Sequence, residues 1–300
     1  MSDGTLQNIS DTALWVAMYR AYESERKDAL FHDPYARRLA GPRGEQIVRS
    51  LSGGRTMSWP MVVRTVAFDD MVLRLTRDGG ADTVLNLAAG LDARPWRLPL
   101  PSDLRWIDVD LPHMLEYKWR AIAGERAHCR YEPRALDLRE TDARRDLFAE
   151  VGNSARSVLV VSEGLLVYLE PPQVASLAQD LAAVPTFRWW AFDLVGPRIL
   201  LRLQKQFGGA LATARAPMHF GPAENTQWFT PHGWREREYH SMIADAMRLK
   251  RQPPMAWTWK IMMKLMPPER RAQMFRMAGN VLLERSDRLE ADAPAARVPL

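Results

Sequence analysis

Cysteine is nearly missing from this chain: among its 300 residues, only Cys129 carries a thiol. One cysteine cannot form an intramolecular disulfide or build a cysteine-based zinc site. The six histidines are scattered and show no HxxxH or HxH pairing with carboxylates, the spacings that bring metal ligands together on one element. A metal site would have to be assembled from residues far apart in the sequence, and we predict none.

Long hydrophobic runs are missing as well. No apolar stretch approaches the roughly 20 residues that a membrane-spanning helix needs. The first residues, MSDGTLQNISDTALW, have neither the basic start nor the apolar block of a signal peptide. We therefore expect a soluble, cytoplasmic protein. Its net charge of +5 is a mild basic excess, which suits acidic partners without requiring them.

What the chain does contain is enough apolar sequence for a full core, since 47% of its residues are hydrophobic and 26% are charged. Residues 10–30 and 56–78 carry apolar side chains at helical spacing. This periodicity predicts that the first 80 residues are helical and precede any strand.

From residue 82 onward the periodicity changes to short apolar runs of the kind found in buried strands. These runs, with a weaker one at 128–132, are 83–88, 104–109, 157–162 and 187–195. Helical patterns lie between them, most clearly at 111–123 and 171–184. Strands that alternate with helices favour an α/β fold, with a doubly wound parallel sheet covered on both faces.

The same patterns divide the chain into four parts. Residues 1–80 are expected to form a helical cap, and residues 81–195 the α/β core. Residues 196–231 are expected to be an insertion or lid after the fifth strand, because 208–231 is rich in glycine and proline. Residues 232–300 would complete the core, with a helix-like segment at 240–251 and a strand-like one at 280–286.

The stretch VLNLAAGLDAR, residues 84–94, runs from a strand into a turn of small residues. In an open α/β sheet such a turn lies where ligands bind, and small residues let backbone amides approach the ligand. Asp110 ends the second strand, at the roughly 20-residue spacing from Gly90 where a carboxylate binds ribose hydroxyls. The alternative is an ordinary tight turn followed by an aspartate that caps a helix.

Four separated motifs identify a family. VLNLAAGLDAR with WIDVDLP, VVSEGLLVYL at the end of the fourth strand, and the N-terminal FHDPYARRLAG together resemble the leucine carboxyl methyltransferase family. They look most like its bacterial branch of polyketide-type O-methyltransferases. The resemblance spans roughly residues 12–195, with a looser match at GWREREY and ADAMRLKR. It implies a Rossmann-like class I methyltransferase fold that binds S-adenosylmethionine.

The resemblance also implies a role for each matching residue. Arg64 matches the arginine that holds the methionine carboxylate, Glu163 an acid beside the methionine part, and Arg20 an N-terminal basic residue. The other cofactor positions are the turn at Ala88 and Gly90, the ribose-binding Asp110 with Leu111, and the adenine-binding pair Asp137 and Leu138. The family usually has glycine where this chain has Ala88, which puts the affinity for the cofactor in doubt.

The methyl acceptor is left open, as is the oligomeric state. We expect a small, fairly apolar metabolite, with substrate-pocket candidates Tyr19, Tyr22, Tyr168 and His219. A carboxylate acceptor, with an intrinsic pKa of about 4, is already ionised at neutral pH and needs no base. A phenol, with a pKa of about 10, would need one, and His32, His219 or His232 could serve.

Three other functions remain open from the sequence. The same fold could methylate carbon or nitrogen of a natural product. A nicotinamide-dependent oxidoreductase would share the turn and Asp110 but leave Asp137 and Glu163 unexplained. A partner-binding protein could keep the fold without catalysis. Nucleic acid is not an expected partner, because the fourth strand ends in SEGL rather than in an Asn or Asp followed by two prolines.

The segment 248–276 is strongly basic and contains Trp257, Trp259 and several methionines. Such a segment could lie on an anionic membrane surface. We favour the alternative, a lid or core-covering helix with a solvated basic face, because the chain has no second membrane signal.

Overall fold

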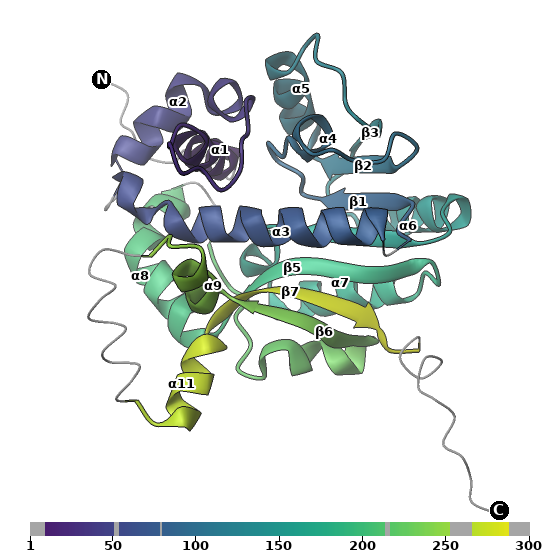
Figure 1. Cartoon of the computed structure of the whole chain (residues 1–300). Helices are drawn as coiled ribbons and strands as arrows, with labels where there is room; N and C mark the ends of the chain where they lie inside the picture. The colour runs from purple at the N-terminus through teal and green to yellow at the C-terminus, as the bar shows by residue number, and fades with distance from the viewer. Residues whose placement is uncertain (1–9, 51–53, 79, 214–216, 253–265, 288–300) are drawn as a thin grey trace, which may run out of the picture.

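A computed structural model describes residues 10–50, 54–78, 80–213, 217–252 and 266–287 of the chain (Figure 1). A seven-stranded sheet runs through this part in the order β3-β2-β1-β4-β5-β7-β6. Its first five strands are parallel, whereas β7 is antiparallel to both β5 and β6. The strands are β1 Thr83–Leu87, β2 Arg105–Asp110, β3 Arg130–Ala135, β4 Val158–Ser162, β5 Phe187–Val195, β6 Trp234–Ser241 and β7 Ala278–Arg285.

The strands alternate their side chains between two cores, one on each face of the sheet. In β5, Trp190 and Phe192 enter the core formed with α6 (Thr141–Ser154), α7 (Pro171–Ala182) and the 3-10 helix η3 (Asn225–His232). Trp189 and Ala191 point to the opposite face, where they pack with α3 (Trp59–Arg77). Both faces are therefore covered, as a doubly wound sheet requires.

The N-terminal region is helical, as the periodicity predicts. It contains α1 (Ser10–Ser24), α2 (Ala36–Ser50), the short η1 (Gly54–Met57) and α3. The first helix ends at Ser24, before the expected limit at residue 30, and α2 is an element that the periodicity does not reveal. Gly41 (φ +59°) and Pro42 break α2 in its middle, which interrupts the apolar spacing that would identify a helix.

Further short helices lie between the strands along the chain. They are α4 (Arg94–Arg97), α5 (Pro112–Ala121), η2 (Leu166–Tyr168), α9 (Met242–Arg248) and α11 (Pro268–Phe275). Proline lies in the first turn of α4, α5, α7 and α11, where its missing N–H has no partner to lose.

The region after β5 differs in part from the prediction. The helix α8 spans Pro197–Thr213. Residues 208–213 are therefore helical, although their glycine content predicts a loop. The edge strand β6, WREREYHS, is also missed because its outer positions are polar. The expected strand at 280–286 is present as β7.

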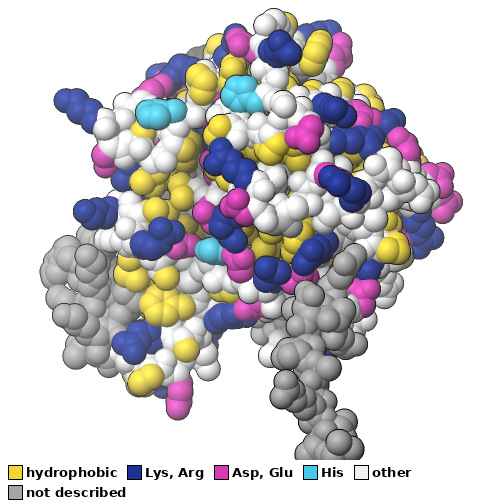
Figure 2. Space-filling model, turned by 45° about the vertical axis from the view of Figure 1, so that its right-hand side comes forward, with side chains coloured by type: hydrophobic (Ala, Val, Ile, Leu, Met, Phe, Trp, Pro, Cys, Tyr) yellow, Lys and Arg dark blue, Asp and Glu magenta, His cyan; other side chains and the backbone are white. Residues whose placement is uncertain are grey.

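The described residues include no helix that is long and apolar enough to cross a membrane. On the face shown in Figure 2, acidic and basic side chains are interspersed. Trp257 and Trp259, on which the question of a membrane-binding or lid segment depends, lie outside the described residues, so that question stays a prediction.

Candidate active site

A cavity of about 790 Å³ opens at the carboxyl ends of the parallel strands. Its wall comes from the segments that follow β1, β2, β3 and β4, from the end of β5, and from α1, α3 and α8. It brings together all nine sequence-predicted cofactor residues, namely Arg20, Arg64, Ala88, Gly90, Asp110, Leu111, Asp137, Leu138 and Glu163. Tyr19, Tyr168 and His219 also line it. Tyr22 does not line this cavity, because it packs among the buried side chains around the N-terminal helices.

The turn after β1 is closed by Asp110 at the end of β2. Asp110 accepts the amide of Gly90 at 2.6 Å on Oδ2 and the amide of Leu111 at 2.7 Å on Oδ1. Burial raises the pKa of Asp110, although these two backbone hydrogen bonds oppose the shift. Each oxygen of a carboxylate can accept two hydrogen bonds, so Asp110 keeps acceptor capacity for hydroxyl groups in the cavity.

Ala88 has a backbone conformation that favours glycine. Its φ is +52°, and Gly90 two residues later has φ +50°. A left-handed conformation costs an L-residue about 1–2 kcal/mol. The departure from the glycine typical of the family therefore places a strained alanine directly in the cavity wall.

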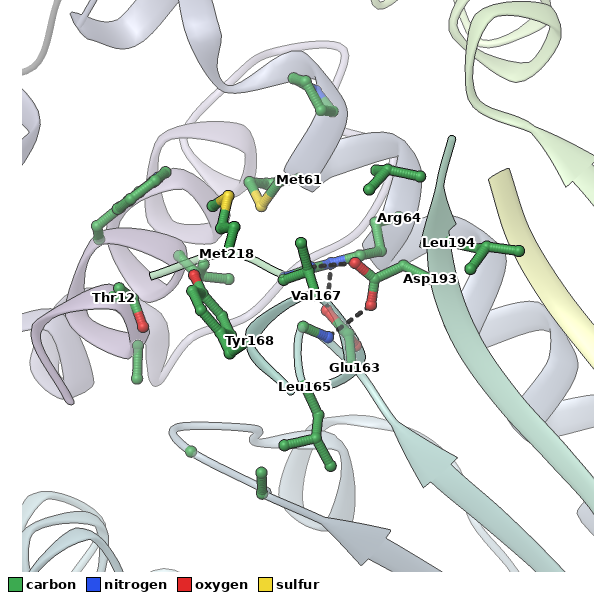
Figure 3. Close-up of a pocket in the computed structure, with 18 of the residues that line it drawn as sticks. Thr12, Met61, Arg64, Glu163, Leu165, Val167, Tyr168, Asp193, Leu194 and Met218 are labelled. Carbon is green, nitrogen blue, oxygen red and sulfur yellow. Dashed lines mark hydrogen bonds and ion pairs between the residues drawn. The ribbon is translucent and has the colours of Figure 1, made fainter. Parts of the chain in front are cut away.

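Arg64 lies at the centre of a buried ionic cluster (Figure 3). Its Nη1 is 3.2 Å from Asp193 Oδ2, and its Nε is 2.9 Å from Glu163 Oε1. Burial disfavours the charge of Arg64, but the carboxylates of Asp193 and Glu163 outweigh this effect and raise its pKa. The approach to Glu163 does not meet the angles of a hydrogen bond, so the buried Nε has no hydrogen-bond partner in the described part of the protein.

Asp193 lies outside the motifs, and Gly164, although it belongs to the motif VVSEGLLVYL, is given no role by the sequence. Asp193 accepts the backbone amide of Gly164 at 2.5 Å and so joins the end of β5 to the segment after β4. Gly164 has φ +70°, and a Cβ at this position would lie 3.2 Å from Nη1 of Arg64. Arg64 therefore packs against a position where a side chain would crowd it.

The ionic cluster extends as a row of side chains with alternating charge, which we call the ionic row. It begins at Arg20 on α1 and ends at Asp193 on β5. Its members, in order of contact, are Arg20, Asp33, Arg97, Asp69, Arg94, Glu163, Arg64 and Asp193. Asp92 branches from Arg94 at 2.8 Å. Burial alone would raise the pKa of Asp92, but the neighbouring cations lower it well below its usual range.

Arg20 is engaged at the start of this row. Its Nε donates to Asp33 at 2.9 Å and its Nη2 donates to the carbonyl oxygen of Leu91 at 2.6 Å. The side chain thus ties α1 to the segment that follows β1 while it lines the cavity.

On the other side of the cavity, Asp137 follows β3. Its carboxylate accepts the backbone amide of Arg139 at 3.0 Å, and the guanidinium of Arg139 donates to it as well. The hydrogen bond from Arg139 is the main reason that the pKa of Asp137 is lowered. Leu138 is half-buried and packs against the core beneath the sheet.

Next to Arg64 the cavity becomes apolar. Figure 3 shows Met61, Leu165, Val167 and Met218 around the ring of Tyr168. Burial raises the pKa of the Tyr168 hydroxyl to about 12, and burial likewise raises that of Tyr19 to about 12. Tyr19 donates a hydrogen bond to the carbonyl oxygen of Gly54 at 3.0 Å. We call this part of the cavity the apolar chamber.

Of the three histidines considered as general bases, the structure places one at the cavity. His219 lines the cavity, whereas His32 and His232 are not among its lining residues. The Nδ1 atom of His219 lies 3.0 Å from Oε1 of Glu170. No such pair is visible from local sequence spacing, because the two residues come from segments far apart in the chain. Among the described residues no cluster of histidine, cysteine and acidic side chains is placed to hold a metal ion.

Comparisons with known proteins point to one family. Residues 13–182 match the family model described as leucine carboxyl methyltransferase. A Streptomyces coelicolor protein named as an S-adenosyl-L-methionine-dependent methyltransferase is 32% identical over 248 residues, which cover 79% of this chain and 86% of that protein. A Parafrankia protein of the same description is 31% identical and covers 82% of this chain, with 83% of its own length matched.

Solved structures show the same fold at lower sequence identity. A Thermobifida fusca protein described as a methyltransferase superposes with a TM-score of 0.56 at 14% identity, covering 93% of this chain and 95% of its own. A DUF574 family protein from Streptomyces avermitilis gives a TM-score of 0.55 at 13% identity, with 90% and 96% coverage.

Proposed function

Because this chain belongs to the leucine carboxyl methyltransferase family and is an S-adenosylmethionine-dependent methyltransferase, we propose that it methylates an oxygen atom of a small, largely apolar metabolite. Membership of this family excludes two of the functions left open by the sequence, a nicotinamide-dependent oxidoreductase and a non-catalytic binding protein. Methylation of carbon or nitrogen remains the competing proposal. S-adenosylmethionine supplies an activated methyl group on a cationic sulfur.

The cavity suits this cofactor, and the observation that carries the proposal is that the buried Nε of Arg64, although it lies 2.9 Å from Glu163, makes no hydrogen bond in the described part of the protein. A buried donor without a partner costs about 1–3 kcal/mol, and the carboxylate of a bound methionine would satisfy it. Glu163 and Asp193 on the same guanidinium would meet the cationic amino group. Asp110 would accept ribose hydroxyls, and Asp137 with Leu138 would hold the adenine.

The acceptor would occupy the apolar chamber. Thr12 and Met61 come from the N-terminal region and Met218 from the region after α8, so we infer that residues 1–80 and 196–231 supply the walls that define the acceptor. Positioning of the reacting atoms alone can contribute about 7–11 kcal/mol to such a displacement. Rigid apolar walls beside the methionine site would supply that positioning.

The test uses S-adenosylmethionine with a ¹³C-labelled methyl group and a panel of aromatic acids, phenols and amines. We expect product signals at the carbon shifts of methoxy groups. Saponification would then separate methyl esters, which are cleaved, from methyl ethers, which survive. Products with the label on nitrogen or carbon would contradict the proposal, whereas calorimetric titration would show independently that the cofactor binds.

A further inference from the structure

His219 and Glu170 form an acid–imidazole pair at the cavity. The two side chains lie 3.0 Å apart, between Nδ1 of His219 and Oε1 of Glu170, and both residues line the cavity. Because the carboxylate engages Nδ1, Nε2 is the nitrogen left to exchange a proton with a bound molecule. Met218, the residue before His219, lines the apolar chamber beside Tyr168 (Figure 3).

Both members of the pair are held in place by their backbones. The amides of His219 and Phe220 donate to the carbonyl oxygen of Val167 at 2.7 and 3.2 Å, and Gln204 on α8 donates to the carbonyl oxygen of Met218 at 2.8 Å. Glu170 is the N-cap of α7, where its amide donates to the side chain of Gln173 at 2.8 Å in a capping box. The backbones of the pair are therefore tied to η2, α7 and α8, while the side chains of His219 and Glu170 are 33% and 55% exposed.

We propose that His219, oriented by Glu170, is the general base of the methyl transfer, and that the acceptor is a hydroxyl compound of the phenol or enol class rather than a carboxylic acid. The inference rests on the proposed transfer to oxygen. An ionised carboxylate acceptor needs no base and would be repelled by Glu170, whereas a phenol keeps its proton at neutral pH.

In this step the acceptor oxygen forms a bond to the methyl carbon, and the bond from that carbon to sulfur breaks. Its electron pair goes to sulfur, which becomes a neutral thioether. The hydroxyl proton moves to Nε2 of His219, and the carboxylate of Glu170 stabilises the resulting imidazolium. Solvent then takes the proton, since the side chain of His219 is 33% exposed. Arg202 on α8 is another charged residue that lines the same cavity.

The experiment compares 2-naphthol with 2-naphthoic acid, which share an apolar body and differ in the acceptor group. Release of S-adenosylhomocysteine is measured across pH for the full chain and for His219→Asn and Glu170→Gln. We expect turnover of 2-naphthol by the unmodified protein and a loss of about 100-fold or more in His219→Asn. The loss should shrink with 4-nitrophenol, which is largely ionised at mildly alkaline pH and needs less help from a base.

His240→Asn is the matched control, because Nε2 of His240 pairs with Glu238 at the same distance of 3.0 Å but His240 does not line the cavity. It should leave the rate and its pH dependence unchanged. The inference is overturned by methylation of 2-naphthoic acid alone, by an unaltered pH profile in His219→Asn, or by cofactor binding with no turnover of either hydroxyl compound. Absence of cofactor binding in calorimetry would instead reject the proposed function.

Discussion

Replacing Gly164 with alanine tests the position of Arg64 by a change that removes no charge. The added Cβ would lie 3.2 Å from Nη1 of Arg64, which is closer than ordinary van der Waals contact. Arg64 has little room to retreat, because Glu163 and Asp193 hold its guanidinium and the side chain is 8% exposed. We expect the guanidinium to shift by a few tenths of an ångström.

Gly164→Ala should have two consequences, one for stability and one for cofactor affinity, which differ in magnitude and are measured by different assays. The left-handed backbone at Gly164, φ +70°, costs alanine about 1–2 kcal/mol, offset by about 0.4–1 kcal/mol from the less flexible unfolded chain. A net loss of about 1 kcal/mol would lower the melting temperature by about 2 °C. A displaced Arg64 would lose much of a charged hydrogen bond, worth about 1.5–3 kcal/mol, so affinity for S-adenosylmethionine should fall about tenfold or more.

Gly124→Ala separates these effects. Gly124 has φ +86°, and a Cβ there would meet nothing within 4 Å, so this variant carries backbone strain without the clash. Calorimetry should show weakened S-adenosylmethionine binding in Gly164→Ala alone, with adenosine bound normally by both variants. Equal stability losses together with unchanged cofactor affinity would refute the assignment of Arg64 to the methionine carboxylate.

Three further predictions concern residues of the cavity. Arg64→Ala should weaken S-adenosylmethionine binding at least tenfold while leaving adenosine affinity unchanged; an equal loss for both ligands in calorimetry would make Arg64 structural. Asp110→Ala should weaken both ligands about tenfold or more, because both carry the ribose; unchanged titrations would remove Asp110 from the site. Tyr168 has a pKa raised to about 12, so its hydroxyl stays protonated between pH 6 and 9, and Tyr168→Phe should leave inflections of the pH–rate profile in that range where they are. An inflection that disappears in this variant would show that Tyr168 itself titrates.

The elements that can be predicted from the sequence are those in which hydrophobic residues recur with a clear helix or strand spacing. The apolar runs around β1, β2, β4 and β5 and the turn at Gly90 are legible because burial on both faces demands unbroken apolar strands. The strand β6 is not predicted because WREREYHS lies at an edge of the sheet, where most of its side chains are exposed or half-buried and no apolar run is required.

Site residues divide in a similar way. Residues at strand ends, such as Asp110 and Glu163, can be placed because the carboxyl ends of parallel strands share one edge. Asp193 has a signal in the sequence, since it is the acid within the apolar run FRWWAFDLV. The pair of Glu170 and His219 had none, because only the packing of the segment after α8 against η2 brings the two residues together.

The ionic row limits which amino-acid substitutions this protein can accept during evolution. Each interior member is flanked by two groups of the opposite sign, so removing one leaves its neighbours as like charges without a shared counterion. Loss of Asp69, for example, would leave Arg94 and Arg97 facing each other, and breaking a buried pair in this way typically costs about 3–5 kcal/mol. Substitutions within the row are therefore less destabilising when they come as compensating pairs. A designer who wishes to reshape the acceptor chamber has freer choice among Met61, Val167 and Met218, which are outside the row, than among the charged residues beside them.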